Sequence, residues 1–316
     1  MPACTVNDDR VGELSGLVVT AGGYIAIDDS NDNPAAIKIF YLTSSCKLSR
    51  TVSYPTAPRD PEDLALAPDG TLWVADTGDN YNAAVRRTTI AVWKLAPGAK
   101  RPVIYRMTYP DGPHDAEALL LDGDGTPVIV TKELSGGAEV FVPSRPLVAS
   151  AAQGVPLVRA GSVRLPGSQT PNFLDSIGRQ VVTGGAVSPD GRHAVLRTYA
   201  DAWEYDVTDG DVVKALLDGV PRQTPLPSEP QGEAIAYTPD GSAFVTAPDQ
   251  PFGQPSTLLR YAPAPRPSPE PSLSVLPGDG EGSGPAAPLP SRALVALGIG
   301  LVALGLAGVL LRRGRR

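Results

Sequence analysis

Carboxylate side chains stand at or near the starts of several short apolar segments in this sequence. Eight of them form the expected metal-ligand set: Glu13, Glu62, Glu117, Glu233, Asp60, Asp63, Asp115 and Asp76. Oxygen donors of this type suit a hard cation, and calcium is the cation that the set favours. Two loops dense in oxygen ligands, 75–80 and 28–33, belong to the same pattern. The alternative is that their Asp and Asn side chains cap turns by accepting bonds from nearby backbone amides.

Three further side chains could act beside such a metal. Lys132 and Arg197 could bind a phosphate or carboxylate group, which would suit an anionic ester. His114 directly precedes Asp115 and is the best candidate for a general acid or base. Alternatively, Lys132 and Arg197 are counter-ions of the acids, and His114 is a turn residue with a satisfied hydrogen bond. The signatures of serine hydrolases, zinc proteases and phosphate-binding loops are missing, so nucleophilic serine chemistry has no support.

The acids belong to a repeated unit that consists of an apolar strand, a tight turn and a second apolar strand. The units begin at Glu13, Glu62, Glu117, Gly185 and Glu233, which are 49, 55, 68 and 48 residues apart. This period is typical of a four-stranded propeller blade. Pro-Asp-Gly and Gly-Asp-Gly turns supply the backbone angles that a hairpin needs. The sequence therefore predicts an all-β propeller with five visible repeats and five or six blades of four strands.

A propeller brings the starts of its innermost strands together at one mouth of a central channel. Glu13, Glu62, Glu117 and Glu233 would then form an acidic ring. Carboxylates in one cavity repel each other unless a positive charge lies among them. The unit at Gly185 has no carboxylate at the matching position, and such a gap can admit a ligand.

The segment Pro61-Glu-Asp-Leu-Ala-Leu-Ala-Pro-Asp-Gly-Thr-Leu-Trp-Val-Ala-Asp-Thr-Gly-Asp-Asn80 resembles propellers of the gluconolactonase, NHL-repeat, phytase-like esterase and WD-repeat-like groups. The resemblance covers 13–261, with its specific part confined to the inner strands. It implies calcium at the channel mouth, with a ligating glutamate comparable in place to Glu13, Glu62, Glu117 or Glu233. The whole chain resembles exported, membrane-anchored propellers of high-GC Gram-positive bacteria.

The C-terminal part differs in composition from the predicted propeller domain, 1–262. The segment 263–291 holds nine prolines and four glycines, which predicts a disordered, semi-rigid stalk. The segment 292–316 follows, with nineteen uncharged residues at 293–311 and then four arginines. This pattern predicts a single transmembrane helix with its basic end in the cytoplasm and the propeller outside the plasma membrane. A tail-anchored protein with a cytoplasmic propeller is the alternative.

The sequence before the first repeat lacks the basic and apolar regions of a secretory signal, so we expect that the signal was trimmed or the start misplaced. Cys4 and Cys46 are the only cysteines. In an exported domain such a pair favours one disulfide, here joining the N-terminal strand to the first blade. Two buried free thiols are the alternative.

The formal charge is −7. Nucleic acid is excluded as a default partner, because phosphate neutralisation needs clustered Lys and Arg. We therefore expect a small-molecule or protein ligand that is cationic or bridged by the metal. The sequence favours a membrane-anchored extracellular propeller that binds this ligand at an acidic, calcium-binding mouth. A metal-dependent hydrolase of phosphate esters or lactones is the alternative, and a structural spacer is a third reading.

Overall fold

The structure is a computed structural model that describes residues 1–29, 33–81, 83–250 and 254–265. Its twenty strands fall into five sets of four antiparallel strands, here called blades 1 to 5. Blade 1 contains β2 (Leu14–Thr20), β3 (Gly23–Asp28), β4 (Lys38–Thr43) and β5 (Leu48–Ser53). Blade 2 contains β6 (Pro61–Leu66), β7 (Leu72–Asp76), β8 (Ile90–Leu95) and β9 (Val103–Thr108). Blade 3 contains β10 (Ala116–Leu121), β11 (Pro127–Thr131), β12 (Ala138–Pro143) and β13 (Val155–Val163).

Blade 4 contains β14 (Val182–Val187), β15 (His193–Thr198), β16 (Asp201–Asp206) and β17 (Arg222–Pro225). Blade 5 contains β18 (Gly232–Tyr237), β19 (Phe244–Pro248) and β20 (Ser256–Tyr261), and β1 (Pro2–Val6) completes it. Two short helices, α1 (Asp175–Gly178) and α2 (Val212–Asp218), lie in connections before β14 and β17. A two-residue parallel pairing of β13 with β9 joins blades 2 and 3 into one eight-stranded sheet.

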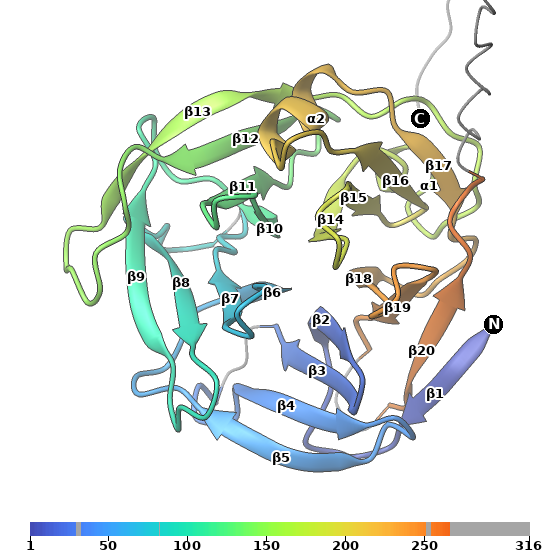
Figure 1. Cartoon of the computed structure of the whole chain (residues 1–316), viewed down its shortest axis with the longest axis horizontal. Coiled ribbons are helices and arrows are strands. Elements are labelled where there is room, and N and C mark those ends of the chain that lie inside the picture. The colour runs from blue at the N-terminus through green and yellow to red at the C-terminus, as the bar shows by residue number, and fades with distance from the viewer. Residues whose placement is uncertain (30–32, 82, 251–253, 266–316) are drawn as a thin grey trace, which may run out of the picture. The chain divides into compact units, whose positions relative to one another are not determined.

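The blades stand radially around a central axis, with β2, β6, β10, β14 and β18 innermost (Figure 1). Each inner strand contacts the inner strand on either side, so these five strands form a closed ring. The molecule is therefore a β-propeller, and the predicted all-β fold is confirmed. Clusters of apolar side chains fill the spaces between blades; one of them packs Trp93 and Val74 of blade 2 against Ile27 and Ile39 of blade 1.

Tight turns explain why each repeat folds as a hairpin. Gly70, Gly125, Gly191 and Gly241 follow an aspartate in four equivalent turns, and all four have φ between 66° and 83°. Glycine adopts this left-handed conformation without steric cost. The strands on either side are buried and rich in Val, Ile, Leu and Ala, as in β7, where all five residues are buried.

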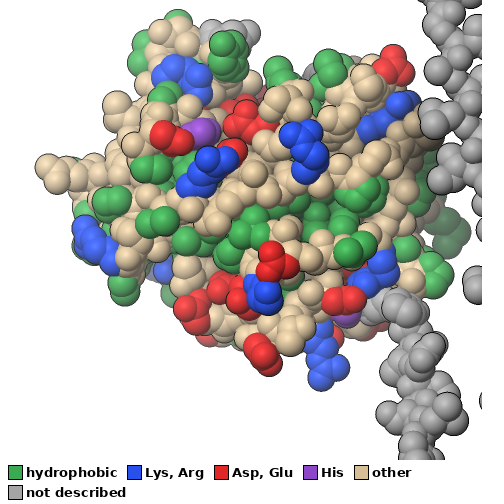
Figure 2. Space-filling model, turned by 90° about the horizontal axis from the view of Figure 1, so that it is seen from above, with side chains coloured by type: hydrophobic (Ala, Val, Ile, Leu, Met, Phe, Trp, Pro, Cys, Tyr) green, Lys and Arg blue, Asp and Glu red, His purple; other side chains and the backbone are tan. Residues whose placement is uncertain are grey.

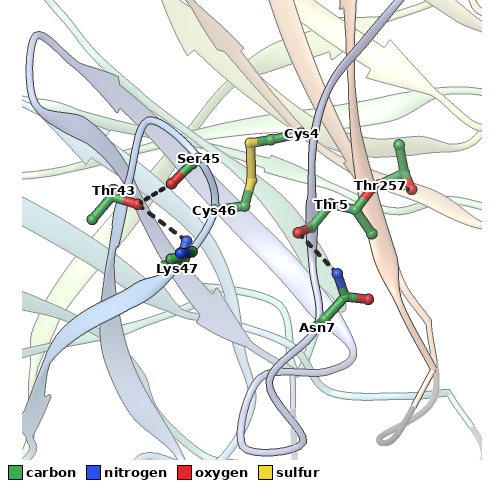
Figure 3. Close-up of a disulfide and its surroundings, with 8 residues drawn as sticks. All are labelled: Cys4, Thr5, Asn7, Thr43, Ser45, Cys46, Lys47 and Thr257. Atoms are coloured by element: carbon green, nitrogen blue, oxygen red, sulfur yellow. Dashed lines mark hydrogen bonds between the residues drawn. A yellow bond between two sulfur atoms is a disulfide. The ribbon is translucent and has the colours of Figure 1, made fainter.

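Strands from the two ends of the chain close the ring. β1 pairs antiparallel with β20 and so becomes the outer strand of blade 5. Cys4 of β1 forms a disulfide with Cys46, which lies in the turn between β4 and β5 of blade 1 (Figure 3). The predicted disulfide is confirmed, and it fastens the closing strand to the first blade.

Neighbouring inner strands approach each other closely around their third residues, Gly16, Asp63 and Gly184, at a level here called the waist. A Cβ atom on Gly16 would lie 2.9 Å from the backbone of Asp63 and Leu64, and one on Gly184 would overlap with the carbonyl oxygen of Glu233. The buried carboxyl of Asp63 fills the waist: Oδ2 accepts from the backbone amides of Leu119 (2.8 Å) and Gly185 (3.2 Å). One side chain of blade 2 thus joins blades 3 and 4.

No helix within the described residues is long and apolar enough to cross a bilayer. The predicted transmembrane helix, 292–316, and all but the first three residues of the predicted stalk, 263–291, lie outside the described residues.

Candidate metal centre at the channel mouth

Every inner strand carries a β-bulge at its second residue. In each blade the register shifts between the first and third residues of the strand, which leaves one extra residue. The five bulge residues are Ser15, Glu62, Glu117, Thr183 and Glu233. A bulge turns the side chain of its extra residue and is common next to functional sites. The repeat of the sequence is therefore also a repeat of this local distortion, which places one side chain of each blade at the same level of the mouth.

Two further sets of residues surround the bulges. The entry residues precede each inner strand: Glu13, Asp60, Asp115, Val181 and Gln231. In each blade, one residue of the second strand pairs with the first residue of the inner strand. The exit residues come directly after it: Asp29, Thr77, Lys132, Tyr199 and Asp249. In blades 1, 2, 3 and 5 the exit amide donates to the entry carbonyl oxygen, for example from Lys132 to Asp115 at 2.8 Å. Blade 4 contributes no carboxylate to the three sets.

This register corrects one sequence alignment. The repeat matches Glu13 with Glu62, Glu117 and Glu233, whereas the strand pairing matches Glu13 with the entry residues Asp60 and Asp115. Ser15 occupies the bulge of blade 1, and its hydroxyl donates to Glu62 O at 2.7 Å and to Glu62 Oε2 at 3.0 Å. Thr183, rather than Gly185, occupies the bulge of blade 4.

Five carboxylates converge into two overlapping groups. Asp29, Asp60 and Glu62 each place one oxygen within 4.8 Å of the others, and so do Glu62, Asp115 and Glu117. Glu62 belongs to both groups. Gly78 makes room for them, because a Cβ there would overlap with Glu62 Oε1 and lie 2.6 Å from Asp60 Oδ2. Any other residue at 78 would displace these carboxylates.

Two carboxylate oxygens of this cluster have no hydrogen-bond partner in the described part of the chain: Asp60 Oδ1 and Glu117 Oε2. Both residues are buried, with 6% and 4% of their surface exposed. An unsatisfied buried oxygen costs free energy unless a cation or proton meets it. The residues present therefore fit a cation with oxygen ligands, which would lie among Asp29, Asp60, Glu62, Asp115 and Glu117.

Burial and mutual repulsion raise the pKa values of these acids. Desolvation, followed by the hydrogen bond with Asp29, raises the pKa of Asp60 to about 8. Desolvation also raises the pKa of Glu62 and of Glu117 well above the ordinary range, and neighbouring carboxylates add to the effect at Glu62. Desolvation, then Glu233 and Asp29, raises the pKa of Asp249 to about 7. The cluster therefore holds protons at neutral pH unless a cation replaces them.

A basic and an aromatic side chain border the cluster on the side of blade 4. Lys132 Nζ forms an ion pair with Glu117 and lies 5.5 Å from the centre of the Tyr199 ring. Burial by itself lowers the pKa of Lys132, but the carboxylates of Glu117 and Glu233 raise it by more. The net pKa lies above its ordinary value, so Lys132 keeps its charge. The Tyr199 hydroxyl donates to Glu233 Oε1 at 3.2 Å. Glu233 thus faces Tyr199 and is in neither carboxylate group.

Three of the predicted site residues bind other parts of the protein. Asp63 lies at the waist, as described above. Asp76 accepts from Arg87 (2.9 Å), from the indole of Trp93 (3.1 Å) and from the Asp60 amide (3.1 Å), so it positions Asp60 from outside the cluster. Arg197 is completely buried, where it donates to Glu229 Oε2 at 3.0 Å and to the Ala234 carbonyl at 2.9 Å.

The histidine predicted as an acid or base lies beside Asp115 but is held by other partners. His114 Nε2 is 2.9 Å from Asp111 Oδ1, and Nδ1 is 3.6 Å from Glu133 Oε1. Its ring packs against the rings of Tyr109 and Phe141. The structure therefore describes a fixed histidine with two carboxylate neighbours, and it agrees with the alternative of a satisfied turn residue.

Three residues of the mouth were not singled out from the sequence: Ser15, Gly78 and Tyr199. Tyr199 carries no charge that could single it out. Its signal is positional, because Thr198-Tyr199 occupies the place that Thr131-Lys132 occupies one blade earlier. On the side of the propeller that Figure 2 shows, acidic and basic side chains are interspersed.

No protein-family model matches the chain, and no curated protein matches its sequence. Solved propeller structures resemble it at low identity. A glutaminyl cyclase from Myxococcus xanthus is 12% identical, with 83% of this chain and 96% of that chain covered and a TM-score of 0.44. A gluconolactonase from Xanthomonas campestris is 14% identical, with 78% and 72% covered and a TM-score of 0.42. A PQQ-bound aldose sugar dehydrogenase from Streptomyces coelicolor is 11% identical, with 82% and 96% covered and a TM-score of 0.40.

Proposed function

We propose that this five-bladed propeller holds a calcium ion at its channel mouth and binds a ligand through it. The single observation that carries the proposal is the pair of buried, unpartnered oxygens, Asp60 Oδ1 and Glu117 Oε2, within two carboxylate groups that share Glu62. The ligands would be Asp29, Asp60, Glu62, Asp115 and Glu117. When bound, the ion would supply positive charge for an anionic group of the ligand.

The ligand would approach from the side of blade 4. Here the three sets of mouth residues offer Val181, Thr183 and Tyr199 in place of carboxylates. Lys132 stands between this neutral side and the acids, paired with Glu117. An anionic or metal-bridged small molecule or protein would thus meet less repulsion here than over the other four blades.

A calcium titration of the full chain tests the proposal. After treatment with EDTA, calcium should raise the melting temperature, because a ligand bound only by the folded state stabilises it. Glu62→Gln should lose this rise, since Glu62 belongs to both groups. Glu139→Gln is the matched control: Glu139 pairs with Arg159 on β12 and β13 and belongs to neither carboxylate group. No rise in the unmodified protein would refute the calcium site.

Metal-dependent hydrolysis of phosphate esters or lactones is the second candidate. The observation that favours it is the position of Lys132 and the Tyr199 hydroxyl beside the cluster, where they could orient an anionic substrate. His114 and Arg197, the other predicted catalytic residues, are bound to Asp111 and Glu229. Turnover of a phosphoester or lactone that requires calcium and is lost in Glu117→Gln would support hydrolysis. Calcium binding without turnover would leave the binding function.

We further propose that segment 292–316 anchors the propeller to the plasma membrane with its C-terminus in the cytoplasm. Support comes from the apolar run at 293–311 and the arginines that follow it. Protease treatment of intact cells should remove the propeller while leaving a membrane-bound C-terminal fragment. Full protection of the propeller would favour the tail-anchored alternative.

A further inference from the structure

A second concave site lies at the opposite end of the channel. It is a cavity of about 600 Å³, bounded by residues near the ends of the five inner strands and by the turns that follow β6, β10 and β14. Its apolar walls include Leu17, Leu64, Leu66, Leu121, Val187 and Tyr237. All five blades contribute. This volume lies within the range of small-molecule sites, about 300–1,000 Å³, and is sufficient for an alkyl chain or ring system.

The waist separates this cavity from the metal centre. Gly16 and Gly184 show that neighbouring inner strands approach too closely there even for a Cβ atom. The Asp63 carboxyl is fully buried at the same level and bonded to blades 3 and 4. None of the described residues that line the cavity belongs to the carboxylate groups, and the Asp63 carboxyl lies between the two levels, so the cavity is a site separate from the metal centre.

The ionisable residues that line the cavity determine which charge an otherwise apolar ligand can carry. Among the described residues that line it, the only ionisable ones besides Tyr237 are Asp122 and Asp190, and Tyr237 directs its hydroxyl to Glu204. Hydrogen bonds from Ser188 and from the Arg192 amide, with the nearby charges of His193 and Arg192, lower the pKa of Asp190, so it is ionised at neutral pH. Burial raises the pKa of Asp122, so Asp190 is the lining carboxylate that carries the charge argument.

The turns around the cavity add more negative charge. Asp69 and Asp124 occupy the equivalent turns of blades 2 and 3, beside the lining residues Gly70 and Gly125. Backbone amides two residues ahead lower the pKa of both carboxyls. The cavity thus has apolar walls and an acidic rim, which favours a cation over an anion of the same size.

We infer that this cavity binds an amphiphilic organic cation. The apolar part would lie between the ends of the inner strands, and an ammonium group would lie at the rim near Asp190. A neutral apolar molecule would gain the same burial without the charge interaction. An anion would meet Asp122 and Asp190 with no basic partner in the described lining.

Three probes of eight carbon atoms each, with similar alkyl chains, separate the effect of apolar burial from that of charge. We would titrate the full chain, in EDTA, with n-octylammonium, n-octanol and n-octanoate below their micelle concentrations and measure Kd by calorimetry. Octylammonium should bind about tenfold more tightly than octanol, and octanoate should bind most weakly. Equal affinities, or tightest binding of octanoate, would overturn the inference.

Variants place the binding in the cavity. Leu66→Arg puts a positive charge in the wall at a residue that is 42% exposed, and it should weaken octylammonium binding at least tenfold. The matched control is Val158→Arg, on the outer strand β13 and 49% exposed, which should leave binding unchanged. Equal loss in both variants would place the probe elsewhere and refute the site.

Asp190→Asn keeps the turn, because the amide oxygen can still accept from Ser188 and the Arg192 backbone. It should bring the affinity for octylammonium down to that for octanol, even if Leu66→Arg fails to fold. Addition of calcium should change none of these affinities, because the cavity is separate from the metal centre. The outcome is thus independent of the calcium proposal.

Discussion

The two ends of the channel use the same residue type in opposite ways. At the mouth, Asp60 and Asp115 are desolvated, and burial raises the pKa of each. At the cavity end, Asp69 and Asp240 lie exposed in turns, where hydrogen bonds from the backbone or from Thr238 lower the pKa. For these four aspartates the direction of the pKa shift follows the end of the inner strand that each adjoins, whereas burial raises the pKa of Asp122 at the cavity end.

The cause of the difference is local geometry. A bulge at the start of each inner strand interrupts the alternation of side chains and brings acids together around one axis. A tight turn at the other end directs its aspartate to an amide of its own turn, as Asp124 Oδ1 accepts from the Thr126 amide at 2.8 Å. The bulges leave carboxylate oxygens at the mouth without a protein partner among the described residues, where a cation can bind. The turns give each aspartate a hydrogen-bond donor within the chain.

The largest change in stability should come from removing the disulfide. This variant also tests whether a loss of stability at the cavity end changes calcium binding at the mouth. Cys46 lies in a turn at that end, and the bond spans 42 residues. Cys4→Ser with Cys46→Ser should lower the free energy of unfolding by about 4 kcal/mol, on the chain-entropy argument. Urea unfolding would measure this loss. Calcium affinity at a temperature where the variant is folded should be unchanged, and a large change would show that the two ends are coupled.

The next effect concerns the acid between the ends. Asp63→Asn keeps one acceptor oxygen, so its amide must face either the Leu64 N–H, which now donates to Oδ1, or the N–H groups of Leu119 and Gly185, which now donate to Oδ2. Unsatisfied buried donors should lower the free energy of unfolding by about 3 kcal/mol. The control is Asp69→Asn in the exposed turn of the same blade, which should leave the urea midpoint unchanged. Equal effects of the two substitutions would remove the distinction between buried and turn aspartates.

The dependence of stability on pH should separate the two kinds of acid. The pKa of Asp60 is raised to about 8 and that of Asp249 to about 7, so the folded protein keeps protons that the unfolded chain loses above about pH 4. The metal-free protein should therefore lose stability as the pH rises from 5 to 8, on the order of 3 kcal/mol. The turn acids, with lowered pKa values, change charge only below this window.

Chemical denaturation in EDTA at pH 5, 6.5 and 8 would measure this slope, and repetition with calcium should reverse it. The ligands must lose their protons to bind the ion, so calcium affinity rises with pH. A metal-free protein that becomes more stable towards pH 8 would contradict the raised pKa values of the mouth.

The smallest effect should distinguish blades within the mouth. Ser15→Ala removes the hydroxyl that donates to Glu62, and loss of such a positioning bond should weaken calcium binding about tenfold. Thr183→Val removes the equivalent hydroxyl of blade 4, which donates to the Gly232 carbonyl at 2.9 Å. Calorimetry should show unchanged calcium affinity in this second variant. Equal weakening in both would indicate a general effect on the ring.

The architecture could be predicted because it rests on signals that are local in the sequence. The Asp-Gly turns and the apolar runs around them identify the hairpins, and two cysteines in one chain leave a single pairing. The mouth was predicted in outline for the same reason, since Glu62 and Glu117 begin their repeats.

The finer arrangement of the site depends on pairing between strands, which a single sequence does not display. One extra residue in a bulge moves Glu13 out of line with Glu62, and nothing in Glu13-Leu-Ser15 marks the shift. Glu62 and Asp63 are adjacent and similar in type, yet the bulge directs the first to the mouth and the second to the waist. Gly78 could not be recognised either, because its role is the space that it leaves for other side chains.

The repeated bulge also has a consequence for how this protein could change. Each blade presents one bulge side chain, and the hydrogen-bonded ladders on either side do not depend on what that side chain is. The charge of the mouth is therefore a sum of separate single-residue choices, in which Ser15 and Thr183 are the neutral members. Exchange of a hydroxyl residue for glutamate, or the reverse, would step this charge by one unit at a time. The preference of the mouth for ligands of a given charge can therefore change through single substitutions while the propeller fold is retained.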